Sequence, residues 1–343
     1  MSDPLRVAVV GLGRWGNTLA SYIERTPGMK ITTCFTRTPE KRKAFSEKFS
    51  CSEEESYEAV VRHPDVDAVV IAAPNNKHAE LAMAAAEQGK HILVDKPIAA
   101  SIADAKKMIR ACEDAGVTLA VGASSRWLRG HRLFKQMLDE GTIGTLAMAE
   151  TNYSNDRGLH YTPDNWQWYA EGSPGGPLLQ VAIHQVDNLL YLYGPIKRAS
   201  AAFSKIKTKS EIPDVSVVWF EFESGLLGTL GTSFISPRTP NGRYTYFMNA
   251  YGDEANLYHD RWEGIKILKK DGEKREEIPY EEYPRQDYLI EEFKDFAGAV
   301  REKRPPEVGG AEGLHVLGAV WAAMRSWERG EPVEVAEILE EDD

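Results

Sequence analysis

A glycine-rich segment near the N-terminus could bind a phosphate-bearing cofactor. Gly11-Leu12-Gly13-Arg14-Trp15-Gly16 matches G-x-G-x-x-G, directly after an apolar run and at the start of an amphipathic one. In that setting the glycines allow a tight strand–helix turn and let the backbone approach a pyrophosphate. The N–H groups at the helix start would face the anion. A tight turn without a ligand is the alternative.

The end of the next apolar run bears on which dinucleotide binds. NAD sites usually place an acid about 20 residues beyond the glycines, where it accepts hydrogen bonds from the ribose 2′-hydroxyl. Here Thr36 and Arg37 follow the run, and no acid stands at that place. A hydroxyl beside a guanidinium suits a 2′-phosphate, with Lys41 and Arg42 adding positive charge. We expect NADP as the cofactor and NAD as the alternative, unless Arg37 is only a solvated loop residue.

Two further segments carry groups that could move a proton or stabilise an oxyanion. Lys96, in Asp95-Lys96-Pro97, ends an apolar run and could donate to a substrate oxygen, favouring its alkoxide. His184 could take a hydroxyl proton, since a histidine titrates near neutral pH. A surface lysine and a structural histidine are the alternatives.

The segment around His184 has the pattern of a helix at the wall of a cleft. Pro177 follows two glycines and suits a first helical turn, and Gly194-Pro195 suits its end. One face is apolar, and the other is polar with spacings of four, three and four residues. The polar face comprises Gln180, His184, Asp187 and Tyr191, and the apolar face Leu179, Ile183, Val186 and Leu190.

An aromatic stretch precedes this helix. Aromatic faces mixed with polar groups suit a sugar ring, a cyclitol or an aromatic-ring diol, and packing between domains is the alternative. We expect Asn155 and Trp166 to contact substrate. The stretch contains Tyr153, Asn155, Asp156, Arg157, His160, Tyr161, Trp166, Trp168 and Tyr169.

The order of elements predicts an α/β chain of two domains. Short apolar runs at 5–10, 30–36, 68–73, 91–95 and 118–122 alternate with helix-like segments at 15–25, 40–49, 77–88 and 101–115. This alternation indicates a doubly wound parallel sheet over residues 1–124. β-prone runs at 215–223, 226–233, 243–250, 255–258 and 265–269 then succeed one another with short turns, which favours an antiparallel sheet within 125–343. Two helices close the chain, the first with Leu289, Phe293, Phe296 and Val300 on one face.

Composition excludes several classes of protein. The 343 residues carry 41 Lys+Arg against 52 Asp+Glu, a net charge of −11, which argues against sequence-independent nucleic-acid binding. Three cysteines without C-x-x-C spacing suggest neither a disulfide framework nor a zinc site. No signal segment opens the sequence and no apolar run is long enough for a membrane span. We expect a cytoplasmic protein without a metal or a membrane partner.

Taken together, these segments resemble the glucose–fructose oxidoreductase/inositol dehydrogenase/MocA (Gfo/Idh/MocA) family over nearly the whole chain. Residues 89–97 are similar to the family's segment that ends in Glu-Lys-Pro, with Asp95 in place of the glutamate. The other segments that carry the resemblance are Val7-Ala8-Val9-Val10-Gly11-Leu12-Gly13, Ala72-Ala73-Pro74-Asn75-Asn76-Lys77-His78, Gly141-Thr142-Ile143-Gly144 and the Gly-Gly…His-x-x-Asp helix.

The resemblance implies an N-terminal Rossmann domain and a C-terminal α+β domain with an open, mostly antiparallel sheet that commonly forms homodimers or homotetramers. It also implies that Lys96 and His184 are catalytic and that Arg126 and Trp127 line the cleft. The expected cofactor-binding residues are Gly11, Gly13, Arg14, Trp15, Gly16, Thr36, Arg37, Pro74, Asn75, His78, Asp95 and Lys96, and the expected substrate-binding residues are Gln180, Asp187, Arg126, Asn155 and Trp166.

The activity expected on this basis is NADP-dependent hydride transfer on a secondary alcohol or ketone of a sugar, cyclitol or related cyclic compound. Gln180 departs from the family pattern, because many relatives have an aspartate there; a carboxylate would favour the imidazolium of His184, whereas an amide can only orient the ring. Three alternatives stay open: a dihydrodiol-type dehydrogenase, a glycoside-cleaving enzyme with retained NAD, and a dinucleotide-sensing regulator.

Overall fold

The structure is a computed structural model that describes residues 3–272, 275–279 and 287–341. The chain divides into two compact units. The first contains the chain up to Trp127 and the segment Pro284–Leu314, and the second contains Leu128–Tyr283 and the segment that begins at His315. Segment 284–314, which the sequence analysis assigned to the C-terminal domain, therefore groups with the N-terminal unit.

The first unit is built on a six-stranded parallel sheet. The strand order β3-β2-β1-β4-β5-β6 is that of a dinucleotide-binding fold, as predicted. Its central strands are almost wholly buried because helices cover both faces, which explains their runs of Val, Ile and Ala. The strands are β1 (Leu5–Val10), β2 (Met29–Phe35), β3 (Ser52–Glu53), β4 (Ala68–Ile71), β5 (His91–Asp95) and β6 (Leu119–Gly122).

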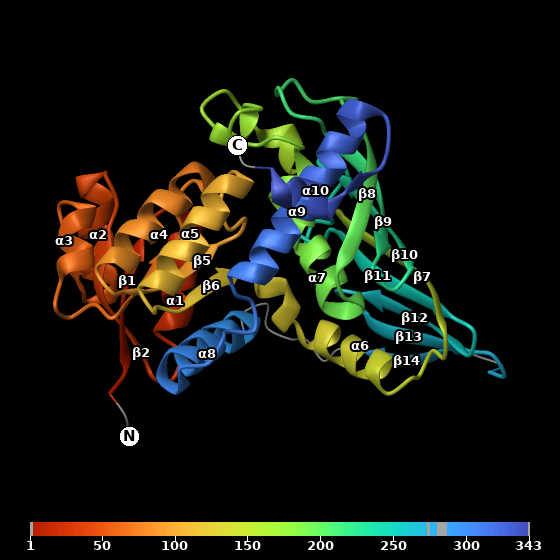
Figure 1. Ribbon diagram of the computed structural model, residues 1–343, viewed down its shortest axis with the longest axis horizontal. Helices are drawn as coiled ribbons and strands as arrows, with labels where there is room; N and C mark the ends of the chain where they lie inside the picture. Colours follow the sequence, from red (N-terminus) through yellow and green to blue (C-terminus); the bar gives the residue numbers. More distant parts are fainter. Residues whose placement is uncertain (1–2, 273–274, 280–286, 342–343) are drawn as a thin grey trace. The chain divides into compact units, whose positions relative to one another are not determined.

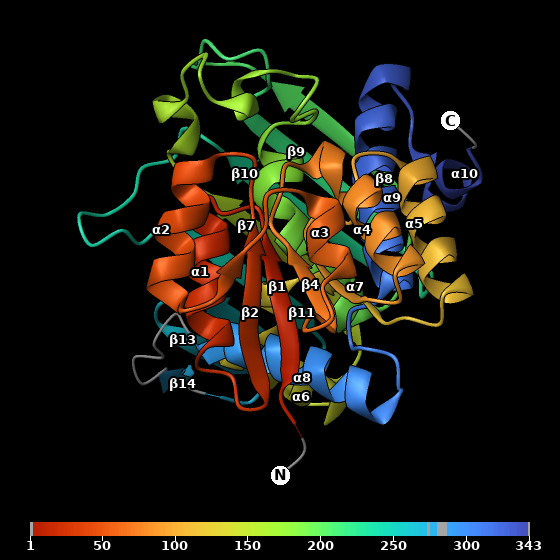
Figure 2. The same ribbon diagram turned by 90° about the vertical axis from the view of Figure 1, so that its left-hand side faces the viewer.

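Helices cover the sheet in two groups, one in which α4 packs against α3 and α5, and one in which α1 packs against α8 (Figure 2). Helix α8 buries Leu289, Phe293 and Phe296, the face that the sequence pattern predicts. The short elements β3 and α3 were not anticipated, since two and six residues carry too little periodicity. The helices are α1 (Arg14–Ile23), α2 (Pro39–Phe49), α3 (Tyr57–Arg62), α4 (His78–Glu87), α5 (Ile102–Asp114) and α8 (Asp287–Glu302).

The second unit contains a nine-stranded sheet, seen at the right of Figure 1. Its order is β14-β13-β12-β11-β7-β10-β9-β8-β15, and every neighbouring pair is antiparallel except β7 and β10. The mostly antiparallel sheet is thus confirmed, although β7, β8, β14 and β15 were not predicted. The strands are β7 (Leu146–Ser154), β8 (Ile196–Ser204), β9 (Val215–Phe222), β10 (Leu227–Ser233), β11 (Thr245–Gly252), β12 (Ala255–Asp260), β13 (Gly264–Lys269), β14 (Glu276–Pro279) and β15 (Val333–Glu334).

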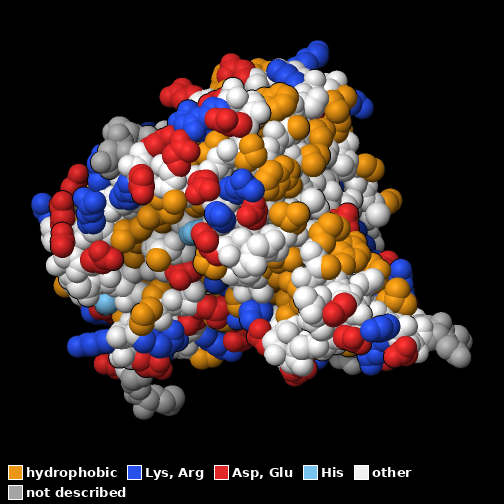
Figure 3. All heavy atoms as spheres, turned by 45° about the vertical axis from the view of Figure 1, so that its right-hand side comes forward, with side chains coloured by type: hydrophobic (Ala, Val, Ile, Leu, Met, Phe, Trp, Pro, Cys, Tyr) orange, Lys and Arg blue, Asp and Glu red, His pale blue; other side chains and the backbone are white. Residues whose placement is uncertain are grey.

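Burial alternates along these strands, so the two faces of the sheet differ. Val218, Phe220 and Leu230 are fully buried, whereas Val217 and Leu227 on the opposite face are 56% and 52% exposed. Figure 3 shows hydrophobic side chains among polar ones on this side of the unit. One face therefore builds the core and the other is open.

Helices α6 (Arg129–Asp139) and α7 (Ile183–Tyr193) pack on the buried face, where Phe134 and Leu192 join Met248 and Leu257 in one apolar cluster. Two more helices, α9 (Gly310–Arg329) and α10 (Val335–Glu340), lie at the C-terminal end of the chain. None of the helices among the described residues is long and apolar enough to cross a membrane.

Candidate active site

The glycine turn between β1 and α1 has the geometry that a pyrophosphate needs. Gly11 has a φ of +92°, and a Cβ there would lie 2.5 Å from the carbonyl oxygen of Ala72. A Cβ on Gly16 would lie 2.0 Å from the carbonyl oxygen of Gly11, so both positions require glycine. A Cβ on Gly13 would meet no atom within 4 Å, and this residue begins α1 without a side-chain cap. The N-terminus of α1 thus offers backbone N–H groups to an anion.

The loop after β2 presents Arg37 to solvent. Arg37 is exposed, and within the described part of the chain its side chain makes no hydrogen bond or ion pair. Arg42, in contrast, is buried: its Nη1 donates to the carbonyl oxygen of Thr36 at 2.9 Å, and its Nε lies 3.9 Å from Glu53. Arg42 therefore braces the loop, while Arg37 extends from it.

His78 connects two loops that carry expected cofactor contacts. Its ring is fully buried at the start of α4, just after Pro74 and Asn75. Nε2 lies 2.9 Å from the carbonyl oxygen of Ala73, and Nδ1 lies 2.8 Å from that of Pro97. Burial lowers the pKa of His78, although nearby Asp95 opposes this. A neutral ring has one N–H and donates to one of the two carbonyls.

Lys96 is half-buried directly after β5, and its peptide bond to Pro97 is cis. Burial raises the pKa of the neighbouring Asp95, while Lys96, His78 and a hydrogen bond from Trp15 oppose the shift. Trp15 belongs to the first turn of α1. The structure thus ties the end of β5 to the glycine turn, at the carboxyl edge of the sheet where ligands bind in this fold.

Arg126 follows β6 in a 3₁₀ turn, Ser124–Trp127. It is 4% exposed, and its Nη1 lies 3.5 Å from the carbonyl oxygen of Glu307. Within the first unit, Arg126 therefore holds the segment after α8. Trp127 is half-buried beside it.

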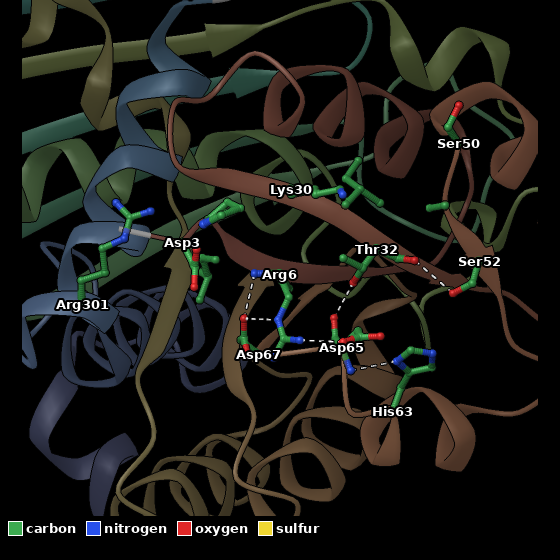
Figure 4. Close-up of a pocket in the computed structure, with 14 residues that line it drawn as sticks. Asp3, Arg6, Lys30, Thr32, Ser50, Ser52, His63, Asp65, Asp67 and Arg301 are labelled. Carbon is green, nitrogen blue, oxygen red and sulfur yellow. Dashed lines mark hydrogen bonds and ion pairs between the residues drawn. The ribbon is translucent and has the colours of Figure 1, made fainter. Parts of the chain in front are cut away.

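A hollow in the first unit lies away from these groups. Figure 4 shows it at the amino ends of β1 and β2, with a volume of about 920 Å³. Arg6 occupies it and pairs with Asp65 and Asp67, each at 2.7 Å. Since ligands of this fold bind at the opposite edge of the sheet, we assign the hollow no part in the site.

The helix that carries His184 differs from the predicted regular α-helix. Residues Leu178–Ala182 form a π-helical turn before α7, so the interval between Gln180 and His184 spans a wider turn than the expected α-helical one. Gly176 lies so close to the chain that a Cβ would meet the carbonyl oxygen of Pro213 at 2.2 Å. Gln180 is buried and donates to the hydroxyl of Ser173 at 2.7 Å. Such π turns occur often at functional sites.

His184 is half-buried beside the aromatic ring of Tyr153 on β7, with ring centroids 6.5 Å apart. Asp187, one turn further along, is 3% exposed. Tyr191, the last member of the predicted polar face, accepts a hydrogen bond from Arg132 at 3.0 Å. The helix therefore brings His184 to the surface of its unit and buries its polar neighbours.

A buried polar network, which the sequence analysis missed, fixes α7 on the sheet. Gln185 donates to the carbonyl oxygen of Asn152 at 3.0 Å, and Asn188 donates to Gln185 and to Tyr246, each at 3.0 Å. His131 lies 3.1 Å from Asn188. Gln185 and Asn188, two amides three residues apart on the same helix, were the signal in the sequence that could have indicated this network.

The aromatic stretch before the helix is partly packed and partly exposed. Trp166 is 39% exposed. Tyr161 packs edge-on against Phe234 at 5.8 Å. Asn155 is buried, and its Oδ1 accepts the N–H of Arg157 at 2.9 Å, so its side chain holds a turn. Among the described residues no group of three or more His, Cys, Asp or Glu side chains could hold a metal ion.

Comparison with known proteins places this geometry in a family. Residues 5–123 match the model of an oxidoreductase family with an NAD-binding Rossmann fold, and residues 131–258 match the Gfo/Idh/MocA C-terminal domain. The myo-inositol 2-dehydrogenase of Thermotoga maritima is 26% identical, over 98% of this chain and 100% of the relative.

Solved structures agree. A protein of Desulfitobacterium hafniense, provisionally named an NADPH-dependent oxidoreductase, is 32% identical with a TM-score of 0.91, covering 99% of this chain and 100% of that one. A levoglucosan dehydrogenase solved with NADH and levoglucosan has a TM-score of 0.88 at 22% identity, covering 97% and 100% of the two chains, and supports the fold alone. Both family models and both units of the fold lead to one conclusion: the chain belongs to the Gfo/Idh/MocA family of oxidoreductases.

Proposed function

We propose that the protein is an NADP(H)-preferring oxidoreductase that transfers hydride between the nicotinamide and a secondary alcohol or ketone of a sugar, cyclitol or related cyclic compound. The observation that carries the proposal is the glycine turn between β1 and α1, where Gly11 and Gly16 have no room for a Cβ and no side chain caps the first turn of α1. Lys96 directly follows β5, a strand of the same parallel sheet, at the carboxyl edge where ligands bind in this fold.

The residues of the first unit fit a dinucleotide. Gly13 leaves space beside uncapped N–H groups, which suits a pyrophosphate. Arg37 is exposed at the end of β2, where a 2′-phosphate would need a cation. When bound, the nicotinamide accepts or returns the hydride. Pro74, Asn75 and the loop held by His78 would border it.

The chemistry at the substrate falls to two side chains. His184 takes the hydroxyl proton during oxidation and returns it during reduction. Lys96 Nζ donates to the same substrate oxygen and stabilises its negative charge. Four further side chains are proposed to border the substrate: Gln180, Asp187, Arg126 and Trp166. Gln180 is held in place by its hydrogen bond to Ser173.

Two observations support the substrate class. The related myo-inositol 2-dehydrogenase is named for a cyclic polyol. Half-buried Tyr153 lies beside His184 and adds an aromatic side chain of the kind that packs against such rings.

We also propose that the chain forms a homodimer or homotetramer through the open face of the second sheet. Met148, Val217 and Leu227 expose apolar side chains there, at 41%, 56% and 52%. Large exposed apolar surfaces commonly mark association sites. Analytical ultracentrifugation that finds only monomer at micromolar concentration would exclude this assembly.

The function is tested by following nicotinamide absorbance with NADP⁺ and NAD⁺ over a panel of sugars, inositols and cyclic cis-diols. We expect turnover with one compound class, faster with NADP⁺, and its loss in Lys96→Met. Turnover of cis-diols alone would indicate a dihydrodiol dehydrogenase. Bond cleavage without net cofactor reduction would indicate a glycoside-cleaving enzyme, and cofactor binding without any reaction would indicate a regulator.

A further inference from the structure

Two of the three cysteines, Cys34 and Cys51, lie on the same face of the first sheet. Cys34 belongs to β2, and Cys51 directly precedes β3, which pairs with β2 in parallel. Thr33 and Ser52 are partners in this pair, and their hydroxyl oxygens lie 3.1 Å apart, so both side chains point to one face. Because side chains alternate along a strand, the neighbouring Cys34 and Cys51 point to the other face.

Helix α2 packs on this other face and contacts both cysteines. The Sγ of Cys34 lies 3.9 Å from the carbonyl oxygen of Arg42. The N–H of Cys51 donates to the carbonyl oxygen of Ser46 at 3.2 Å, and the hydroxyl of Ser46 donates to the carbonyl oxygen of Cys51. Arg42 and Ser46 are four residues apart and therefore lie on one side of the helix, one turn from each other. Both cysteines are thus held against the same turn of α2.

The two thiols differ in exposure and in acidity. Cys34 is fully buried, whereas Cys51 is half-buried and lines the hollow at the amino ends of β1 and β2 (Figure 4). A hydrogen bond between the two thiols raises the pKa of Cys34, as burial also does, and lowers the pKa of Cys51 although burial opposes this. The thiolate is the form of cysteine that attacks an oxidant, and an accessible thiolate beside a second thiol is typical of redox-active pairs. Cys51 therefore suits the attacking sulfur and Cys34 the resolving one.

Cys34 is also connected to the segments that border the expected cofactor site. The next residue, Phe35, accepts with its carbonyl oxygen the N–H of Gly11 in the glycine turn, at 3.0 Å. Arg42, whose carbonyl oxygen contacts Cys34, donates to the carbonyl oxygen of Thr36 in the loop after β2. A covalent bond that moves Cys34 therefore acts on the glycine turn and on this loop.

We propose that Cys34 and Cys51 are a modification site: a hydroperoxide such as hydrogen peroxide oxidises them to a disulfide, and this disulfide weakens the binding of the dinucleotide. The disulfide is independent of the proposed function, whereas its effect on the cofactor rests on it. Cys112 takes no part, because it is buried on α5, where burial raises its pKa to about 12.

The oxidation uses one molecule of peroxide for the two thiols. The thiolate of Cys51 attacks one oxygen of hydrogen peroxide, the O–O bond breaks, and the hydroxide that leaves takes up the proton that Cys51 released. Cys51 is then a sulfenic acid. The sulfur of Cys34 attacks that of Cys51, the S–O bond breaks, and the hydroxyl group leaves as water with the proton of Cys34. Each sulfur loses one electron, the peroxide is reduced to water, and dithiothreitol reverses the oxidation.

Counting free thiols in the full chain tests whether the disulfide forms. The reduced protein is treated with hydrogen peroxide, denatured and alkylated, and mass spectrometry counts the alkylated cysteines. We expect the count to fall from three to one, with Cys112 alkylated and a peptide in which Cys34 is linked to Cys51. Dithiothreitol should restore all three thiols. Three free thiols after treatment, or a link that joins two chains instead, would overturn the proposal.

Substitutions assign a role to each cysteine. Cys34→Ser should leave Cys51 as a sulfenic acid that dimedone traps, and Cys51→Ser should leave Cys34 as a thiol. Cys34→Ala is a second variant if serine does not fold, since alanine places no polar group in the core. Cys112→Ser is the matched control and should form the same disulfide as the unmodified sequence. A folded Cys34 variant in which peroxide leaves Cys51 unchanged would contradict the attacking role.

Fluorescence titration with NADPH measures the effect on the cofactor, using reduced, oxidised and re-reduced protein. We expect oxidation to raise the Kd by about 10-fold or more, the loss of one charged hydrogen bond, and reduction to restore it. Cys51→Ser should keep its affinity through the treatment, and Cys112→Ser should lose affinity as the unmodified sequence does. An unchanged Kd in the disulfide form, or an equal rise in treated Cys51→Ser, would overturn the effect of the disulfide.

The two measurements separate this inference from the proposed function. A reduced chain that binds neither NADPH nor NADH would refute the cofactor site and, with it, the effect of the disulfide on binding. The thiol count needs no cofactor, so it decides by itself whether Cys34 and Cys51 form the modification site.

Discussion

Arg37 and Arg42 show how two arginines in one short segment take different roles. Arg42 is buried and its guanidinium donates a hydrogen bond to the backbone of Thr36, so this side chain stabilises the loop. Arg37 is exposed at the tip of the same loop. Arg42 therefore fixes the loop from which Arg37 extends, and in the proposed site Arg37 is the residue that contacts the 2′-phosphate while Arg42 acts only through the loop.

Arg37→Ala should weaken NADPH binding by about 10-fold or more and leave NADH binding nearly unchanged, since a charged hydrogen bond to phosphate contributes roughly 1.5–3 kcal/mol. Fluorescence titration with each cofactor measures this. Lys30→Ala is the control, because Lys30 is an exposed cation near the opposite end of β2. Equal losses for the two cofactors would contradict a 2′-phosphate contact.

His184→Ala should slow turnover by about 10²- to 10⁴-fold, the range attributed to general acid–base catalysis, and leave cofactor affinity nearly unchanged. Steady-state kinetics and a binding titration on the same preparation separate the two effects. His160→Ala, at an exposed position in the same unit, should have little effect on either. A parallel collapse of cofactor binding would show that His184 supports the structure instead.

At the scale of elements, loops and helices hold the candidate residues in place through buried polar groups. His78 bridges the loops after β4 and β5, and therefore holds Pro74 and Lys96 on a common frame. In the second unit, Gln185 and Asn188 attach α7 to β7 and β11 from within the core. Such groups are costly to leave unpaired, which makes the arrangement specific.

Gln185→Leu tests this attachment. The substitution removes the side-chain donor to the carbonyl oxygen of Asn152 and one of the two acceptors of Asn188, so the free energy of unfolding should fall by roughly 1–3 kcal/mol. Urea unfolding measures the change. Gln136→Leu, on the exposed side of α6, should change it by less than about 0.5 kcal/mol. An unchanged midpoint in Gln185→Leu would show that the network does not hold the helix.

At the scale of the whole molecule, buried histidines make stability depend on pH. Burial and nearby Arg261 lower the pKa of His259 to about 3, and burial also lowers that of His78. In the unfolded chain both rings take up a proton near pH 6.5. Between pH 6.5 and about 3 the unfolded state therefore binds more protons, and the free energy of unfolding falls as the pH falls.

His259→Gln should reduce that fall between pH 7.5 and 4.5 by on the order of 2 kcal/mol, measured by urea unfolding at both pH values. Carboxylates change the stability of both proteins alike, so the difference between wild type and variant reports on His259. Asp214 is an example: although burial opposes the shift, hydrogen bonds from the backbone of residues 206–208 lower its pKa. A carboxylate of this kind loses its contribution to stability mainly below about pH 4. His160→Gln, with an exposed ring, should keep the wild-type slope.

The sequence by itself determined the alternating strands and helices of residues 5–122, apart from β3 and α3, and most strands of the second sheet. Valine- and isoleucine-rich runs of four to seven residues, separated by amphipathic segments, have one stable arrangement, a parallel sheet with covered faces. The glycine pattern also predicted the tight turn between β1 and α1, since Gly11 and Gly16 lie where any Cβ would clash with the backbone. These features are local, and local sequence encodes them.

Only the tertiary structure decided which polar residues face the site. The interval from Gln180 to His184 includes part of a π turn, and Gly176 just before that turn lies against Pro213, a contact between residues far apart in sequence. Segment 284–314 groups with the first unit, where α8 packs against α1 and the turn Ser124–Trp127, a contact that periodicity cannot reveal. Arg238 and Arg261 both lie over the ring of Tyr244 for the same reason: strand pairing brings separate turns together, and no spacing within one segment predicts this contact.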